Sequence, residues 1–230
     1  MSSTTALHGD LSVRVAVDTR RLQWTASPSP SVRRKRVHLV GPPEAGQVTS
    51  IVRYEPGSTF PAHDHPEGEE IFVLEGVFSD EHGDWPAGTY LLNPEGFRHA
   101  PFSREGCVLF VKLRQFPGRD REHVAIPTAA RAWEPGDRPN VETKPLYSQA
   151  GFGDTARLER WAPATAFERM IYTSGAEILV LEGTLEDEAG SYGRGTWLRF
   201  PEQASHGPST ATGCVFYIKE GGLKLLRHEP

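Results

Sequence analysis

The feature that most constrains this chain is an internal repeat. When the 230-residue sequence is shifted by 107 positions, residues 69–112 align with residues 176–219 without a gap, and 20 of the 44 paired residues are identical. Unrelated segments would agree at only a few positions, so the chain contains two copies of one structural unit. A polar stretch from about residue 115 to 128 separates the copies. We therefore divide the sequence into domains 1–118 and 119–230.

Short apolar runs between turn residues predict that both copies are built from β-strands. The 23 glycines and 19 prolines are spread along the chain at short intervals, which is typical of many strands joined by turns. No segment carries a sustained apolar pattern at the helical period. The runs cover residues 71–78, 89–93, 107–113, 177–185, 196–200 and 214–220. We predict an all-β fold, a sandwich or barrel in each copy.

Composition excludes several classes of protein. The formal net charge of −5 gives no overall field that would attract nucleic acid or anionic lipid. No stretch approaches 18 consecutive apolar residues, and two cysteines form no disulfide framework, so we expect a cytoplasmic protein without membrane partners. The basic run Arg33–Arg36 is interpreted as a solvated strand or loop, with a phosphate or partner contact as the alternative.

Two spaced motifs in the first copy contain residues typical of metal sites. The first, from Gly57 to Gly76, reads G-x5-H-x-H-x3-E-x6-G, and the second, from Gly88 to His99, reads G-x5-P-x-G-x2-H. Residues two apart on a strand project from the same face, so His63 and His65 can point together into a barrel. The following strand can add Glu69, and a bend at Pro94 and Gly96 can bring in His99. The candidate ligands are His63, His65, Glu69 and His99.

Three imidazoles and one carboxylate are suited to a first-row transition metal such as Fe, Mn, Ni, Co or Zn. The alternative is a fold that retains the pattern but binds nothing. The repeat offers a test, because residues present in one copy only are candidates for function. The second copy pairs His63 with Met170, His65 with Tyr172 and Glu69 with Ala176. We therefore expect no metal in the second copy.

Residues that both copies share are interpreted as structural. Glu70 is matched by Glu177, which favours Glu69 over Glu70 as the ligand. His99 is matched by His206, which we expect to be hydrogen-bonded in a packed pocket. The pairs Asp80 and Asp187, Gly83 and Gly190, and Cys107 and Cys214 predict a shared turn and two small buried strand residues. Arg98 occurs in the first copy only, and we expect it at the surface, with binding of an anionic substrate as the alternative.

These motifs, together with GEEIFVLEGVFSDEHGDWPAGTY, NPEGFRHAPFS and EGCVLFVKL, resemble the ChrR-type cupins. The resemblance implies a bicupin, with two tandem jelly-roll barrels of the double-stranded β-helix type. It places His63, His65, Glu69 and His99 at the family's metal-ligand positions. The family includes a zinc-binding anti-sigma factor and dioxygenases related to dihydroxyacetophenone dioxygenase. About 23 residues without cysteine precede Trp24, so we do not expect binding to a sigma factor.

The favoured function is a non-haem, dioxygenase-like oxidoreductase acting on a small carbonyl or enolisable compound. It would use one divalent ion per chain, Fe(II) or Zn(II), with Mn or Ni as alternatives. The other hypotheses are a ChrR-like sensor of zinc or a small molecule and a structural bicupin. No residue is assigned as catalytic acid or base. We expect no nucleic-acid partner, a small-molecule ligand, and two barrels in one chain, with a homodimer through residues 11–17 as a further option.

Overall fold

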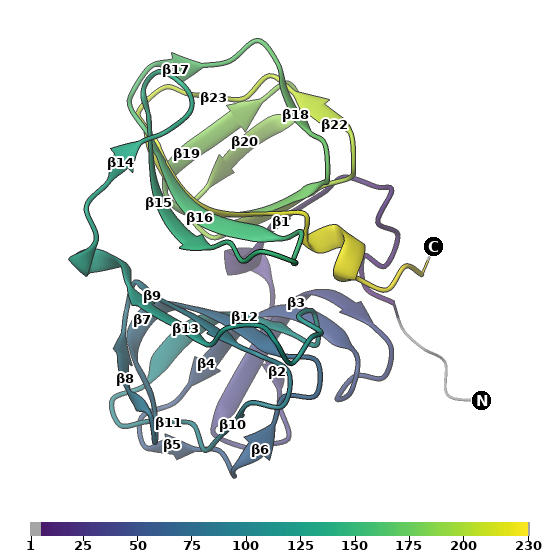
Figure 1. The fold of residues 1–230 in the computed structure, drawn as a ribbon, viewed down its shortest axis with the longest axis vertical. Coiled ribbons are helices and arrows are strands. Elements are labelled where there is room, and N and C mark those ends of the chain that lie inside the picture. Colours follow the sequence, from purple (N-terminus) through teal and green to yellow (C-terminus); the bar gives the residue numbers. More distant parts are fainter. Residues whose placement is uncertain (1–5, 230) are drawn as a thin grey trace. The chain divides into compact units, whose positions relative to one another are not determined.

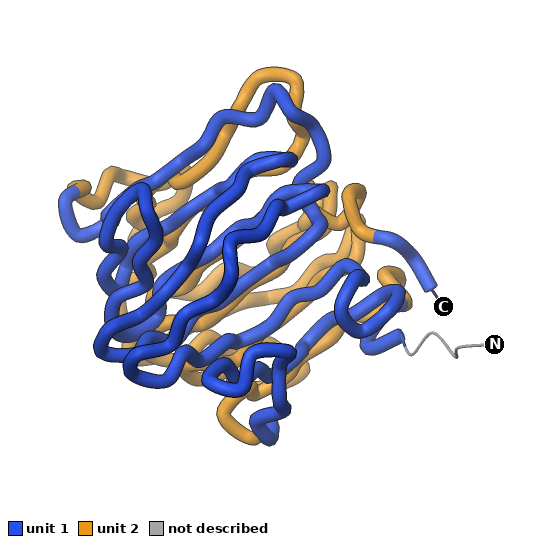
Figure 2. The backbone as a smooth tube through the Cα atoms, turned by 90° about the horizontal axis from the view of Figure 1, so that it is seen from below, with its two compact units in different colours: residues 1–9, 22–130, 227–230 blue, residues 10–21, 131–226 orange. Residues whose placement is uncertain are grey.

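The computed structural model describes residues 6–229 and is built almost entirely of antiparallel strands (Figure 1). It separates into two compact units, each an all-β jelly-roll body, which confirms the predicted fold class. Unit 1 comprises residues 1–9, 22–130 and 227–230, and unit 2 comprises residues 10–21 and 131–226 (Figure 2). Among the described residues, no helix is long and apolar enough to cross a membrane.

Unit 1 contains one ten-stranded sheet and one two-stranded sheet. Its main path runs β13-β9-β7-β12-β4-β3-β2, with β5, β8 and β11 attached to it, while β6 pairs with β10. The strands are β2 (Thr25–Ala26), β3 (Val32–Val40), β4 (Gln47–Tyr54), β5 (Ser58–Thr59), β6 (His63–Asp64), β7 (Glu69–Asp80), β8 (Gly83–Pro86), β9 (Thr89–Asn93), β10 (Arg98–His99), β11 (Phe102–Ser103), β12 (Cys107–Leu113) and β13 (Val124–Pro127), followed by the 3-10 helix η2 (Thr128–Ala130).

Unit 2 repeats this topology. Its main path runs β1-β21-β19-β24-β16-β15-β14, with β17, β20 and β23 attached, while β18 pairs with β22. The elements are β1 (Val15–Asp18), η1 (Thr19–Arg21), β14 (Glu134–Pro135), β15 (Val141–Tyr147), β16 (Thr155–Trp161), β17 (Thr165–Ala166), β18 (Met170–Tyr172), β19 (Ala176–Asp187), β20 (Gly190–Gly193), β21 (Thr196–Phe200), β22 (Ala204–His206), β23 (Ser209–Thr210), β24 (Cys214–Glu220) and η3 (Gly222–Leu225).

The longest strand of each unit bends at the same place. Both β7 and β19 have twelve residues, and each shifts register against its neighbour near its middle. Gly76 follows the shift in β7 with a φ of 72°, and a Cβ there would lie 2.1 Å from the carbonyl oxygen of Gly106. Only glycine fits this close approach. The bend lets the first half of β7 pair with β9 and the second half with β8.

Each unit buries its own apolar core inside the sheets. The core of unit 1 contains Val32, Tyr54, Ile71, Val73, Phe78, Leu91, Cys107, Leu109 and Val111. The core of unit 2 includes Val141, Trp161, Ile178, Val180, Leu198, Phe200, Cys214, Phe216 and Ile218. Both cysteines are free and buried, as expected, and burial raises the pKa of each thiol to about 11.

The strand that precedes each repeat pairs with the other repeat. β1, which comes before the first repeat, pairs with β21, and β13, which comes before the second, pairs with β9. The boundaries of the compact units therefore differ from the predicted domain boundary at residue 118. That boundary remains a prediction, which concerns the two sequence repeats. The segment 11–17, which we considered for dimerisation, overlaps β1 (Val15–Asp18), which pairs with β21 within the chain. A homodimer remains a prediction.

Candidate metal centre

The predicted ligands come from three neighbouring strands of unit 1. His63 begins β6, His65 follows it directly, Glu69 begins β7 and His99 ends β10. β6 and β10 pair antiparallel with His63 opposite His99, so the two motifs meet across one ladder. The structure therefore brings all four residues together, as the sequence analysis anticipated. Whether they bind a metal stays a prediction.

The three imidazole rings form a tight cluster. Ring centroids lie 4.8 Å apart for His63 and His65, 4.9 Å for His65 and His99, and 5.2 Å for His63 and His99. One nitrogen from each ring falls within 4.8 Å of the other two. His65 and His99 are buried, whereas His63 is half-buried. This arrangement can hold a metal ion.

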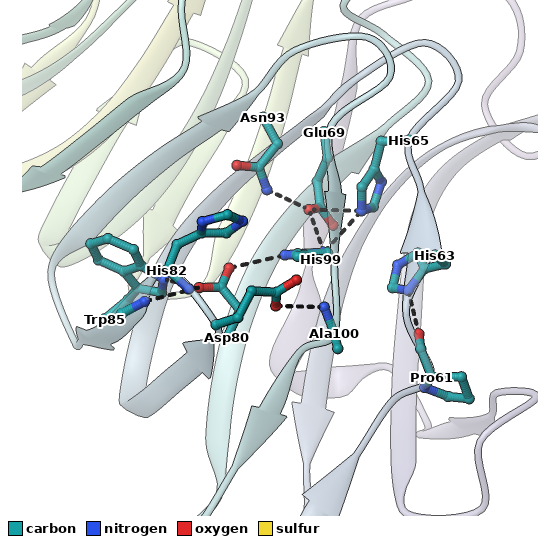
Figure 3. A network of polar contacts seen from close by, with 12 residues as sticks. Pro61, His63, His65, Glu69, Asp80, His82, Trp85, Asn93, His99 and Ala100 are labelled. Atoms are coloured by element: carbon teal, nitrogen blue, oxygen red, sulfur yellow. Dashed lines mark hydrogen bonds and ion pairs between the residues drawn. The ribbon is translucent and has the colours of Figure 1, made fainter.

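Glu69 completes the set. Its Oε2 lies 3.4 Å from Nε2 of His65 and 3.6 Å from Nε2 of His99, and it accepts a hydrogen bond of 2.9 Å from Asn93 Nδ2 (Figure 3). Glu69 and the three histidines line one cavity, whereas Glu70 does not. The placement agrees with the choice of Glu69 over Glu70.

Asp80 orients His99 from behind. Its Oδ2 lies 3.1 Å from Nδ1 of His99, while Oδ1 accepts hydrogen bonds from the backbone N–H groups of His82 and Gly83 and from the indole of Trp85. Burial alone would raise the pKa of Asp80, but these hydrogen bonds lower it, so the group is an anion. A carboxylate can only accept, so a neutral His99 carries its proton on Nδ1 and directs the lone pair of Nε2 into the cluster.

His63 has a similar arrangement. Its Nδ1 lies 2.8 Å from the carbonyl oxygen of Pro61, which can only accept. The Nε2 lone pairs of His63 and His99 are therefore both available. Nε2 of His65 and Nε2 of His99 lie 2.9 Å apart, and Glu69 is adjacent. Two lone pairs beside a carboxylate are the donor set that a divalent cation satisfies, so the residues fit a transition metal.

Burial and charge act differently on the two buried histidines. Burial lowers the pKa of His65 despite the nearby charge of Glu69. Burial acts in the same direction on His99, but the hydrogen bond to Asp80 and the charge on Glu69 outweigh it, so its pKa is raised. His65 is thus the ring that favours the neutral, ligating form before any cation binds.

The cluster opens into a cavity of about 420 Å³ within unit 1. Its walls include the apolar side chains of Tyr54, Phe60, Ile71, Phe78, Leu109 and Val111. A cavity of this size and lining suits one small organic molecule. Arg98 lies outside it, exposed and ion-paired with Asp64 at 3.1 Å, so the expected surface position is confirmed.

The equivalent place in unit 2 holds one histidine. His206 Nδ1 lies 2.9 Å from Asp187 Oδ2, and its Nε2 lies 3.2 Å from the hydroxyl of Tyr172. Met170, Tyr172 and Ala176 are all buried in the core cluster. The expectation that His206 is hydrogen-bonded in a packed pocket is confirmed. Among the described residues, the three-histidine cluster is confined to unit 1.

Sequence reasoning missed two supporting residues. Asp80 was assigned only to a turn, although it also orients His99, and Asn93 was not considered although it bonds Glu69. The signal for Asp80 was present, because the pair of Asp80 and His99 recurs as Asp187 and His206. Asn93 could have been found because Phe200 replaces it in the second copy.

Comparison with known proteins agrees with this architecture. A family model for the ChrR cupin-like domain matches the chain twice, over residues 12–117 and 121–224. The resemblance inferred from the motifs is therefore confirmed. A search of curated protein sequences found no match.

Solved structures share the fold at low sequence identity. A "putative dioxygenase" from Nostoc punctiforme superposes with a TM-score of 0.75 at 17% identity, over 90% of this chain and 82% of that one. A "putative glyoxylate induced protein" from Pseudomonas aeruginosa gives 0.72 at 12% identity, over 96% of each chain. An E162A mutant of Bacillus subtilis oxalate decarboxylase gives 0.62 at 12% identity, over 94% and 78%.

Proposed function

This chain belongs to the ChrR cupin-like family, and we propose that it is a metal-dependent, dioxygenase-like oxidoreductase that acts on a small carbonyl or enolisable compound. One observation carries the proposal. Three histidines and one glutamate of unit 1 converge on a largely apolar cavity of about 420 Å³, and among the described residues the three-histidine cluster occurs in this unit alone. A site that merely stabilised the fold would not need a cavity of this size.

His63, His65, Glu69 and His99 would hold the ion, with Fe(II) or Zn(II) favoured and Mn or Ni as alternatives. When bound, the ion supplies a Lewis acid and, if it is iron, a redox centre. Four protein ligands leave two positions of an octahedral ion free for small molecules. The apolar walls would keep bulk water away from a ligand bound there.

The protein's own groups prepare the site in advance. Asn93 restrains Glu69 through its amide, and Asp80 fixes the tautomer and orientation of His99. Such outer hydrogen bonds raise the basicity of the ligating groups and limit their motion. Two of the structures that share the fold are described as a "putative dioxygenase" and an oxalate decarboxylase, which supports an enzyme of small oxygen-containing compounds.

Oxygen uptake tests the proposal. Purified protein is loaded with Fe(II) to one ion per chain, and oxygen consumption is measured with a panel of β-diketones and hydroxyaryl ketones. We expect at least one compound to be consumed by iron-loaded protein and not by zinc-loaded protein. If every compound stays intact while zinc binds tightly, the protein is not an enzyme of this type.

The family match favours one second candidate, a sensor of zinc or of a small molecule. A four-coordinate zinc with all four protein ligands would be closed to substrate, so tight zinc binding without turnover is its expected signature. Co-purification from native extract tests it. Recovery of a regulatory partner that is released when zinc is removed would support the sensor, and absence of any partner would count against it.

A further inference from the structure

The cavity that contains the histidine cluster is also lined by two arginines of β3, Arg34 and Arg36. They lie two residues apart, so they share the inner face of the strand. The side chains of Arg34 and Arg36 are 17% and 20% exposed. Arg33, the preceding residue, projects from the opposite face of the strand and is exposed. The expectation that the whole basic run is solvated is therefore wrong for Lys35, which is buried, and for Arg34 and Arg36, which are partly buried.

Their hydrogen-bonding capacity is largely unused. Two guanidinium groups offer ten N–H donors. Arg34 donates twice to Glu44, and Arg36 donates once to Glu44 and once to the carbonyl oxygen of Pro43. The Nε atoms of both arginines are buried without a hydrogen-bond partner. One carboxylate thus serves two partly buried cations.

The positive charges of Arg34 and Arg36 are paired with the single carboxylate of Glu44. Glu44 is half exposed, and Arg114 adds a further positive charge to the lining. Burial and the neighbouring charge of Arg34 together lower the pKa of Arg36. An anion placed between the guanidinium groups would relieve this repulsion and satisfy free donors.

The two arginines are specific to the unit that contains the histidine cluster. Arg34 lies opposite Val52 and Arg36 opposite Ser50, whereas in unit 2 the same register places Thr143 opposite Glu159 and Pro145 opposite Arg157. Lys35 and Lys144, on the other face, are shared, and each lies over a tryptophan. The strand thus retains this lysine in both units and changes both arginines on the inner face.

The corresponding interior of unit 2 is neutralised by the protein itself. Arg157 bonds to both Glu159 and Glu220. In unit 1, Val52 occupies the position of Glu159 and Leu113 that of Glu220. Both are apolar and line the cavity. In unit 2 two carboxylates therefore bond to one guanidinium group, whereas in unit 1 the carboxylate of Glu44 is bonded to both Arg34 and Arg36.

We propose that Arg34 and Arg36 form a subsite for a carboxylate group, so that the small molecule bound in this cavity is an enolisable carboxylic acid of the 2-oxo acid class. The inference deepens the proposed function and rests on it only for the reaction. Guanidinium groups recognise planar carboxylates through paired hydrogen bonds, and Arg34 already holds Glu44 with two of its nitrogens. A phosphate dianion would meet stronger repulsion from Glu44 and Glu69.

Calorimetric titration of the full chain tests the subsite without turnover. Pyruvate and phenylpyruvate are compared with their methyl esters, using zinc-loaded and metal-free protein. We expect the acids to bind more tightly than the esters. Arg34→Gln or Arg36→Gln should weaken binding of the acids by about 10- to 100-fold and that of the esters by less than about twofold. Arg33→Gln, on the outer face of the same strand, is the matched control and should change neither.

Several results would overturn the inference. They are equal affinity for acids and esters, equal weakening of both in the arginine variants, or tighter binding of inorganic phosphate than of either acid. The metal content of each variant, and its melting temperature, show that the site and the fold are intact. Arginine-dependent binding of acids without oxygen uptake would leave the inference standing and remove the proposed function. Oxygen uptake with a neutral diketone that neither arginine variant changes would support the proposed function and remove the carboxylate subsite.

Discussion

The two units place the same histidine–aspartate pair in pockets of opposite character. In unit 1, His99 bonds Asp80 and faces two more imidazoles and Glu69. In unit 2, His206 bonds Asp187, and this aspartate is also bound by Arg14 at 2.5 Å and by the hydroxyl of Tyr192. In unit 1 the residues around His99 add a second carboxylate, Glu69, and further imidazole lone pairs. In unit 2 the charge of Asp187 is paired with that of Arg14.

The pKa values of the paired histidines follow this difference. The pKa of His99 is raised because Asp80 and Glu69 outweigh burial. The pKa of His206 is lowered because burial dominates and Arg14 opposes a second positive charge. The pair itself is therefore a structural element, and the surrounding residues decide whether it faces a cation. A positive charge on the ring is thus favoured at His99, beside Asp80 and Glu69, and disfavoured at His206, near Arg14.

The largest expected effect comes from replacing equivalent residues of the two units, His65 and Tyr172, by phenylalanine. His65→Phe should reduce metal affinity by more than about 100-fold, because a ligand is lost and not only an outer hydrogen-bond partner. Tyr172→Phe, at the equivalent position of unit 2, should leave the metal content unchanged and cost about 1 kcal/mol of local stability. Elemental analysis after dialysis against a weak chelator measures the first. Equal metal loss in both variants would contradict the asymmetry.

The aspartates give the next comparison. Asp80→Asn should lower metal affinity by about 10- to 100-fold, because His99 loses the partner that fixes its tautomer. Asp187→Asn should leave metal affinity unchanged and destabilise unit 2 by about 1–3 kcal/mol, since Arg14 and His206 lose a charged acceptor. Competition with a chromogenic chelator measures the affinities. Unchanged affinity in Asp80→Asn would show that Asp80 serves only its turn.

Much of the architecture could be read from the sequence because the repeat and the turn residues mark the strands. The predicted runs at 89–93 and 107–113 coincide with β9 and β12. β7 is longer than its apolar run, because its ends carry polar residues that face the site and the turn. The two-residue strands β6 and β10 could not be predicted, since two residues show no periodicity.

The proposed ligand set could be predicted for a different reason, namely that the second copy lacks three of its four members. The same logic failed for Asp80, because a residue that serves both the turn and the site is retained in both copies. It also failed for Arg34 and Arg36. In a run where every residue is basic, alternation cannot tell which side chains line the cavity.

Unit 2 should weaken as the pH falls below about 6.5. Burial lowers the pKa of His206 despite its bond to Asp187. The unfolded chain therefore takes up the proton first, near 6.5, and stability that is present above that pH is lost below it, by at most about 1.4 kcal/mol per pH unit. Hydrogen exchange in β18 and β22, corrected for intrinsic rates, measures this loss between pH 7.5 and 5.5. His206→Asn should abolish the dependence, and a dependence that persists in this variant would assign it to another group.

The smallest effect concerns a feature that the two units share. Lys35 and Arg53 lie over Trp24 at 4.4 Å each, and Lys144 and Arg160 lie over Trp133 at 4.7 and 4.6 Å. Replacing either tryptophan by leucine should cost about 1 kcal/mol, because the cation–π contacts are lost.

Hydrogen exchange in β3 for Trp24→Leu and in β15 for Trp133→Leu measures these costs. They should agree within about 0.5 kcal/mol, and the metal content should stay at one ion per chain, because neither stack touches the histidine cluster. A cost confined to unit 1 would mean that the Trp24 face of β3 also supports the cavity. The two faces of β3 would then not have separate roles.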